Sequence, residues 1–377
     1  MKRLFTLGTF IFLLTIAGCS KQELENRGKI ESSNINKKNV ENGFELETFS
    51  GKFDFEYISE TDAQSSIGEI KREAYSTQGK YFLRGSENSP EDYLFFVDKN
   101  SGREVLVCNK SNCKHENKDC NAFFDSEIYM GTSMWFQEGN LYIVANYEGE
   151  FCLEKISPDG VTRERVLDIL KQQTETTTNE DGSQEVSYYY PEMQLHRGYL
   201  YYSDSYPGSD STTLWKLSMN NKETAQPIFK IEGENVQIYR VYPFGRYVFF
   251  QAGCVGDAEG NLDISLYAYD IESEDLVYLI KDDVIREYTL KENYLYYEDL
   301  QDKIIQFNLE TGQAETIFGR ENCPEYTEEW NLDTIFFKED KLVLNLCDNH
   351  TGEEMQIMLE DDKTYQVLKE TEMVDCY

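Results

Sequence analysis

Histidine, proline and basic side chains are scarce in this sequence of 377 residues. It holds three histidines and seven prolines, and 70 acidic residues against 36 basic ones give a formal net charge of −34 at pH 7. Such an acidic chain offers no basic stripe to neutralise phosphates, so nucleic acid is excluded as a partner. The few prolines are consistent with a backbone whose amide groups are paired in sheets.

The common catalytic motifs are missing as well. The sequence contains no G-x-S-x-G, H-E-x-x-H, P-loop or G-x-G-x-x-G pattern, and these are the short signatures of hydrolases, zinc proteases and nucleotide-binding enzymes. The three histidines, His115, His196 and His350, lie far apart in the chain. The sequence therefore predicts no catalytic residues and a protein that is not an enzyme.

Long apolar runs are rare, and the clearest one lies at the start of the chain. It spans residues 4–16, follows Lys2 and Arg3, and is too short to cross a bilayer comfortably. These features predict a lipoprotein signal peptide over residues 1–18. The run ends in the letters IAGC, and small residues directly before Cys19 resemble the bacterial lipobox. We expect the thiol of Cys19 to carry a diacylglyceryl group.

The stretch after this cysteine is polar and rich in Asn, Ser, Lys and Glu. Such a composition buries too little apolar surface to fold, so residues 19–42 are predicted to be the lipidated cysteine and a disordered tether. Residues 43–377 have one compositional type and are predicted to form a single domain. The acidic domain would be repelled by an anionic membrane. We therefore expect the lipid alone to hold the protein at the extracytoplasmic face of the cell membrane.

A repeat organises the predicted domain. Six segments begin with a turn rich in Gly, Asn or Asp and continue as an alternating apolar strand. Their equivalent positions are spaced by 60, 59, 48, 47 and 47 residues and are Tyr81, Leu141, Leu200, Val248, Leu295 and Leu342. Four-stranded units repeated at about this period predict an all-β fold, a β-propeller with six four-stranded blades.

Two segments qualify this prediction. The segment GKFDFEYIS (51–59) carries Phe53, Phe55 and Tyr57 at alternate positions and predicts a strand that closes the ring. A seventh blade that starts from this strand is the alternative. The segment RERVLDILKQQ (163–173) is the one short helix that the sequence predicts.

Potential metal ligands gather in the segment CNKSNCKHENKDCNAF (108–123). Cys108, Cys113, His115 and Cys120 follow the pattern Cys-x4-Cys-x-His-x4-Cys. Three thiolates and one imidazole form a tetrahedral set for a structural zinc ion, although a histidine so close to Cys113 is unusual. A disulfide such as Cys108–Cys120 or Cys113–Cys120 is the alternative, because disulfides form in exported chains. In both cases the predicted role is structural, in a loop after the first blade.

Several of these features together resemble a known family. They are the lipobox, the polar tether, the YLYY strands at 199–202 and 294–297, and the cysteine segment at 108–123. The chain in this respect resembles the uncharacterised TolB-like β-propeller lipoproteins of anaerobic Gram-positive bacteria. The resemblance implies a propeller at the cell surface that binds a partner, and it implies no catalytic residues.

We therefore predict a lipid-anchored, extracytoplasmic β-propeller that acts as a ligand-binding, protein-binding or scaffolding module. Its expected partners are the membrane, through Cys19, and an extracellular ligand or an envelope protein. The competing hypothesis is a surface enzyme, similar to a glycoside hydrolase or a polysaccharide lyase, whose active site lies at the propeller axis.

Overall fold

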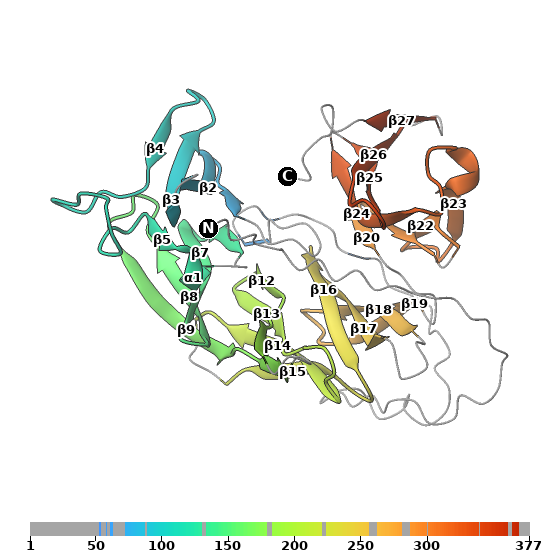
Figure 1. Cartoon of the computed structure of the whole chain (residues 1–377), viewed down its shortest axis with the longest axis horizontal. Helices are drawn as coiled ribbons and strands as arrows, with labels where there is room; N and C mark the ends of the chain where they lie inside the picture. The colour runs from blue at the N-terminus through green and yellow to red at the C-terminus, as the bar shows by residue number, and fades with distance from the viewer. Residues whose placement is uncertain are drawn as a thin grey trace.

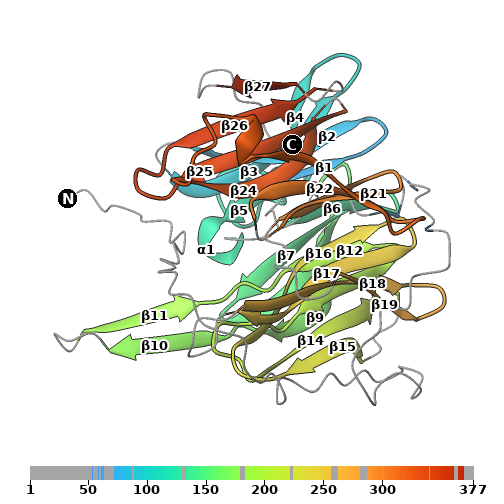
Figure 2. The ribbon, with the colours of Figure 1, turned by 90° about the vertical axis from the view of Figure 1, so that its right-hand side faces the viewer.

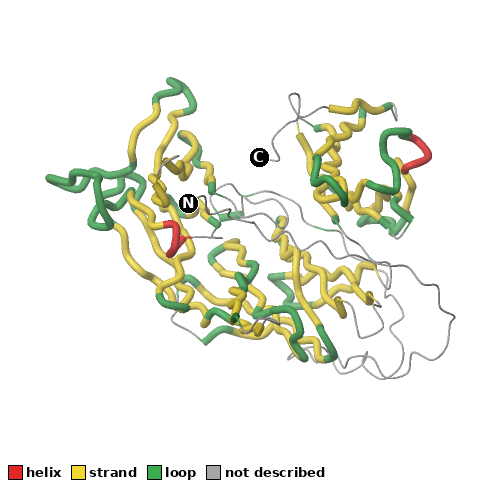
Figure 3. The backbone as a smooth tube through the Cα atoms, in the orientation of Figure 1, coloured by secondary structure: helices red, strands yellow, loops and turns green. Residues whose placement is uncertain are grey.

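In a computed structural model, the protein is an all-β propeller of six four-stranded blades, as the repeat predicts (Figures 1 and 3). The blades follow one another in chain order, from blue to red in Figure 1. The helical elements among the described residues are α1 (Ser126–Tyr129) and η1 (Arg320–Asn322). None of the described helices is long and apolar enough to cross a membrane. The described residues are 53, 58, 61–62, 72–86, 89–129, 133–178, 183–220, 224–255, 262–280, 287–299, 301–338, 340–360 and 364–368.

Each blade is an antiparallel sheet whose strands run in chain order from the axis of the ring to its rim. Blade 1 contains β1 (Glu73–Tyr75), β2 (Gly79–Ser86), β3 (Ser89–Asp98), β4 (Glu104–Leu106) and β5 (Phe123–Asp125). Blade 2 contains β6 (Met134–Gln137), β7 (Asn140–Tyr147), β8 (Glu150–Ile156) and β9 (Arg163–Lys171). Blade 3 contains β12 (Met193–His196), β13 (Tyr199–Ser203), β14 (Ser211–Ser218) and β15 (Gln226–Glu232).

The second half of the ring follows the same plan. Blade 4 contains β16 (Val236–Phe244), β17 (Tyr247–Val255), β18 (Leu262–Asp270) and β19 (Leu276–Ile280). Blade 5 contains β20 (Tyr288–Lys291), β21 (Tyr294–Glu298), β22 (Lys303–Asn308) and β23 (Ala314–Gly319). Blade 6 contains β24 (Trp330–Lys338), β25 (Lys341–Asp348), β26 (Glu354–Leu359) and β27 (Tyr365–Leu368).

The six equivalent positions of the sequence repeat all fall on the second strand of a blade. Each of these side chains is buried, and each strand pairs with the first strand of its own blade. A short turn followed by an alternating strand is a local signal. It therefore located every blade correctly from the sequence, in β2, β7, β13, β17, β21 and β25.

Apolar clusters join consecutive blades. The five clusters join blades 1 and 2, 2 and 3, 3 and 4, 4 and 5, and 5 and 6. None of them joins blade 6 to blade 1 within the part of the chain that the structure describes. Phe53 belongs to the cluster of blades 4 and 5, and its ring centroid lies 4.4 Å from that of Tyr247. The structure gives no strand at Phe53, while Phe55 and Tyr57 lie outside the described residues.

The predicted helix at 163–173 is wrong, because β9 (Arg163–Lys171), a strand at the rim of blade 2, occupies nearly all of this segment. The register with β8 shifts twice, between Phe151 and Cys152 and between Leu153 and Glu154. Such bulges interrupt the simple alternation of a strand. The apolar residues of β9 consequently come in two adjacent pairs three residues apart, a spacing that resembles a helical pattern.

An additional hairpin follows blade 2. It consists of β10 (Thr174–Thr178) and β11 (Gln184–Tyr188), and it projects from the ring (Figure 2). Because strands alternate in direction, this hairpin lies on the opposite face from the turns that join the first two strands of each blade. We call the face with those turns, such as 138–139 and 197–198, face 1, and the face with the hairpin face 2.

Candidate metal centre

The cysteine segment is inserted into the outer strand of blade 1. Both β4 and β5 pair with β3, so together they form one rim strand that is split in two. Leu94 marks the division, because its carbonyl accepts a hydrogen bond from Val107 N and its N–H donates to Ala122 O, each at 2.9 Å. The sequence predicted a loop after the last strand of this blade, whereas the loop interrupts that strand.

The structure brings the four predicted ligands together. One donor atom from each of Cys108, Cys113, His115 and Cys120 lies within 4.8 Å of all the others. His115 Nδ1 is 3.2 Å from Cys120 Sγ. Cys108 and Cys120 are buried, and the three cysteines are free thiols in the structure. The group therefore has the donor types and the proximity that a metal site requires.

The backbone explains how two ligands so near in sequence share one site. His115 has a φ of 58°, in the left-handed region that residues other than glycine rarely adopt. Asn112, just before Cys113, has a φ of 61°. These two left-handed residues curl the loop, so that the side chains of Cys113 and His115 meet at the cluster although one residue separates them. The short spacing between Cys113 and His115 is therefore compatible with one shared metal site.

Backbone N–H groups converge on two of the sulfur atoms. Burial opposes ionisation of Cys108, but N–H groups of Lys110 and Asn121 and the neighbouring thiols lower its pKa below the usual value. Burial raises the pKa of Cys120 to about 12, together with the thiols of Cys113 and Cys108, while the N–H of Ala122 acts in the opposite direction. These N–H groups therefore favour the charged form of the Cys108 sulfur.

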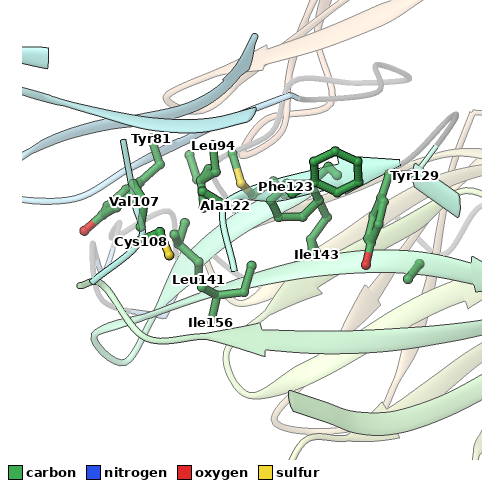
Figure 4. Packing of buried hydrophobic residues seen from close by; sticks show 14 of the residues in the cluster. Tyr81, Leu94, Val107, Cys108, Ala122, Phe123, Tyr129, Leu141, Ile143 and Ile156 are labelled. Atoms are coloured by element: carbon green, nitrogen blue, oxygen red, sulfur yellow. The ribbon is translucent and has the colours of Figure 1, made fainter. Parts of the chain in front are cut away.

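The loop is held against blade 2. Asn121 donates side-chain hydrogen bonds to the carbonyls of Gly160 and Val161 at 2.9 and 2.8 Å. Arg163 donates to Phe123 O at 2.7 Å. Figure 4 shows Cys108 within the apolar cluster of blades 1 and 2, near residues of β7 and β8. The cysteine cluster therefore lies where the rim of blade 1 meets blade 2.

A second group of polar contacts, which the sequence did not reveal, lies on face 1. Asp62 is 1% exposed, and its carboxylate accepts hydrogen bonds from Arg197 Nε and Nη2 at 2.5 and 3.2 Å. Thr61 O accepts from Gln137 Nε2 at 2.8 Å and from Arg197 N at 2.5 Å. These contacts join the N-terminal segment to blades 2 and 3. No local pattern predicts them, because Asp62 and Arg197 lie 135 positions apart.

The other two histidines are structural. His196 is fully buried at the end of β12, and its Nε2 lies 2.7 Å from Gly245 O in blade 4. Burial lowers the pKa of His196 to about 4, which keeps the ring neutral. His350 lies in the turn after β25, where its backbone N–H donates to Asp348 Oδ1 at 2.8 Å. The described structure therefore brings neither of them to the cysteine cluster.

Comparison with known proteins supports the fold. No family model and no curated protein matches the sequence. A structure from a study of two prolyl endopeptidases has a TM-score of 0.51 at 10% identity, over 82% of this chain and 42% of that chain. The chain thus spans less than half of that protein, and the likeness shows a shared fold only.

Weaker likenesses accompany it. TolB from Acinetobacter baumannii has a TM-score of 0.36 at 11% identity, over 76% of this chain and 64% of that chain. An oligogalacturonate lyase in complex with manganese has a TM-score of 0.40 at 9% identity, over 78% of this chain and 74% of that chain.

The close approach of blade 2 to the cluster gives a first prediction. A Cβ on Gly160 would lie 2.2 Å from Val107 O, and its φ is 68°. Gly160→Ala should therefore lower the free energy of unfolding by about 3 kcal/mol, from backbone strain plus overpacking. Gly102→Ala is the matched control, because Gly102 has a φ of 65° with nothing near its Cβ. Urea unfolding should show that Gly102→Ala lowers the free energy of unfolding by about 1 kcal/mol. Equal losses for the two variants would contradict the close approach of Gly160 to Val107 O.

The burial of His196 gives a second prediction. In the unfolded chain the imidazole of His196 is protonated below about pH 6.5, whereas in the folded chain it is protonated only below about pH 4. Stability from this residue is therefore present above pH 6.5 and is lost as the pH falls through that window. When the pH falls from 7 to 5, the free energy of unfolding of His196→Gln should therefore fall by about 2 kcal/mol less than that of the unsubstituted protein. Urea unfolding at both pH values measures this, and parallel losses would show that His196 is not buried in its neutral form.

Proposed function

We propose that the chain is a lipid-anchored, extracytoplasmic β-propeller that binds a ligand or an envelope protein at the cell surface and holds it there. The lipobox at Cys19, which lies outside the described residues, supports the anchor, and the resemblance to TolB-like propeller lipoproteins of anaerobic Gram-positive bacteria supports the location. The fold, a ring of blades with loops on two faces, suits a binding module.

The docking of the N-terminal segment carries this proposal. Thr61 and Asp62 are fixed to the turns of face 1 by Gln137 and Arg197. The segment thus meets the ring on face 1, and we infer that this face is the one directed toward the membrane. Face 2, with the β10–β11 hairpin, is directed away from it and meets the partner.

The hairpin has the features of a contact surface. Tyr188 on β11 is 57% exposed, and Val186 is exposed beside it. At the base of the hairpin lies a small pocket, whose lining includes Phe151, Leu170 and Tyr189. An exposed tyrosine and an exposed valine side by side on the hairpin suit contact with a glycan or a peptide.

The metal cluster has a structural part in this proposal. Four protein ligands would fill a tetrahedral site and would leave no open position for a substrate. The cluster also lies at the rim of the ring, away from the axis where the competing enzyme hypothesis would need its active site. It therefore fastens the scaffold and takes no part in a reaction.

The lipid anchor is tested by the mass of the N-terminus. We expect the full-length protein, extracted from its host membrane, to lack residues 1–18 and to carry lipid on Cys19, because a lipobox is processed in this way. Cys19→Ser should carry no lipid, whereas Cys347→Ser, a substitution remote from the N-terminus, should keep it. Mass spectrometry of the N-terminal peptide measures both. A processed protein with a free thiol at Cys19 would contradict the anchor.

The binding role is tested with arrays of glycans and peptides. The full-length protein should bind one class of probe saturably and leave the mass of the probe unchanged. Replacement of residues 174–188 by a short Gly-Ser linker should weaken this binding at least tenfold, because the hairpin forms part of the contact. Release of smaller products from a polysaccharide would contradict the binding module and favour the surface enzyme.

A further inference from the structure

We propose that the loop between β4 and β5 holds one Zn²⁺ ion, which closes the split rim strand of blade 1 and fixes it against blade 2. The ligands are the sulfur atoms of Cys108, Cys113 and Cys120 and the Nδ1 atom of His115. The site is independent of the lipid anchor and of the partner at face 2.

The donor set selects the metal. Three thiolates and one imidazole are soft and borderline ligands, which suit zinc and exclude calcium and magnesium, because those ions require oxygen. Ligands at the usual zinc distances lie about 3.8 Å apart in a tetrahedron. The four donor atoms already lie within 4.8 Å of one another, and His115 Nδ1 is 3.2 Å from Cys120 Sγ. Small side-chain rotations therefore suffice to close the site.

The surroundings suit a site with negative sulfur atoms. The N–H groups of Lys110 and Asn121 point to Cys108, and that of Ala122 points to Cys120. Hydrogen bonds of this kind orient metal ligands and disperse the charge of a zinc ion with three thiolates, which is −1 in total. In two of these bonds the donor lies two residues after the cysteine, so each of the two turns is shaped to support its own ligand.

A metal explains more of the loop than a disulfide does. A disulfide joins two of the three cysteines and leaves the third thiol and the imidazole without a role. His115 nevertheless adopts a left-handed conformation, which costs about 1 kcal/mol or more. This conformation directs its ring to the cysteines, and metal coordination repays that cost.

The position of the loop between β4 and β5 explains why a metal ion would stabilise it. β4 and β5 have three residues each, and residues 107–122 separate them. Most side chains of this loop are exposed, so it has little apolar surface with which to order itself. Among the described residues, no apolar cluster supports blade 1 from the side of blade 6. A zinc ion would order the loop that Asn121 and Arg163 hold against blade 2.

The proposal is tested on the full-length protein in detergent, purified under reducing conditions. Native mass spectrometry should show one Zn²⁺ per chain, and removal by a chelator should lower the thermal midpoint by about 5 °C. Cys113→Ser should reduce zinc occupancy at least tenfold. Cys347→Ser should keep full occupancy, because Cys347 lies in blade 6, outside the cluster.

A second variant separates metal loss from misfolding. His115→Ala keeps all three thiols and should weaken zinc binding while circular dichroism still reports the β-sheet. Co²⁺ added to the chelated protein should give the absorption bands of a tetrahedral thiolate site, and these bands should be absent in Cys113→Ser. A metal-free protein with a mass two hydrogens lower would overturn the proposal in favour of a disulfide. Full zinc occupancy in Cys113→Ser would overturn the assignment of the ligands.

Discussion

Burial of one blade against the next is the constraint on which this structure depends. A four-stranded sheet has two faces, and a blade with apolar side chains on both needs a neighbour on each side. Five apolar clusters meet this need for the inner members of the series. Blades 1 and 6 each have one such cluster among the described residues. Two polar groups described above, the cysteine cluster and the Asp62–Arg197 pair, add contacts in the first three blades.

Those two groups act in different ways. The pair of Asp62 and Arg197 is largely buried, and such pairs add little net stability but specify which groups must meet. It fixes where the N-terminal segment enters the ring. The cysteine cluster acts on the rim strand of blade 1 and on the turn of blade 2 that contains Gly160. The first group thus lies at the inner strands of blades 2 and 3, and the second lies at the rim of blade 1.

The sequence predicted what depends on local pattern. The turn-and-strand repeat located all six blades, and the cysteine spacing identified the four residues that come together. Prediction from the sequence failed where pairing with a distant segment determines the local structure. Strand β9 looked helical because its partner β8 introduces bulges, and the split of the rim strand depends on Leu94 in β3. The docking of Asp62 joins residues too far apart for any periodic signal.

The contacts of Asp62 and of the cysteine loop with blade 2 lie toward the same face of the ring. The turn of blade 2 that contacts the cysteine loop joins the third and fourth strands of its blade, so it lies on face 1, as the contacts of Asp62 do. The contacts of Asp62 and those of the blade 2 turn are therefore gathered on one face. Face 2 carries the hairpin, and among the described residues neither of these two sets of contacts lies on it. Loops that carry no such contacts tolerate change, which is why we propose that a partner binds on this face.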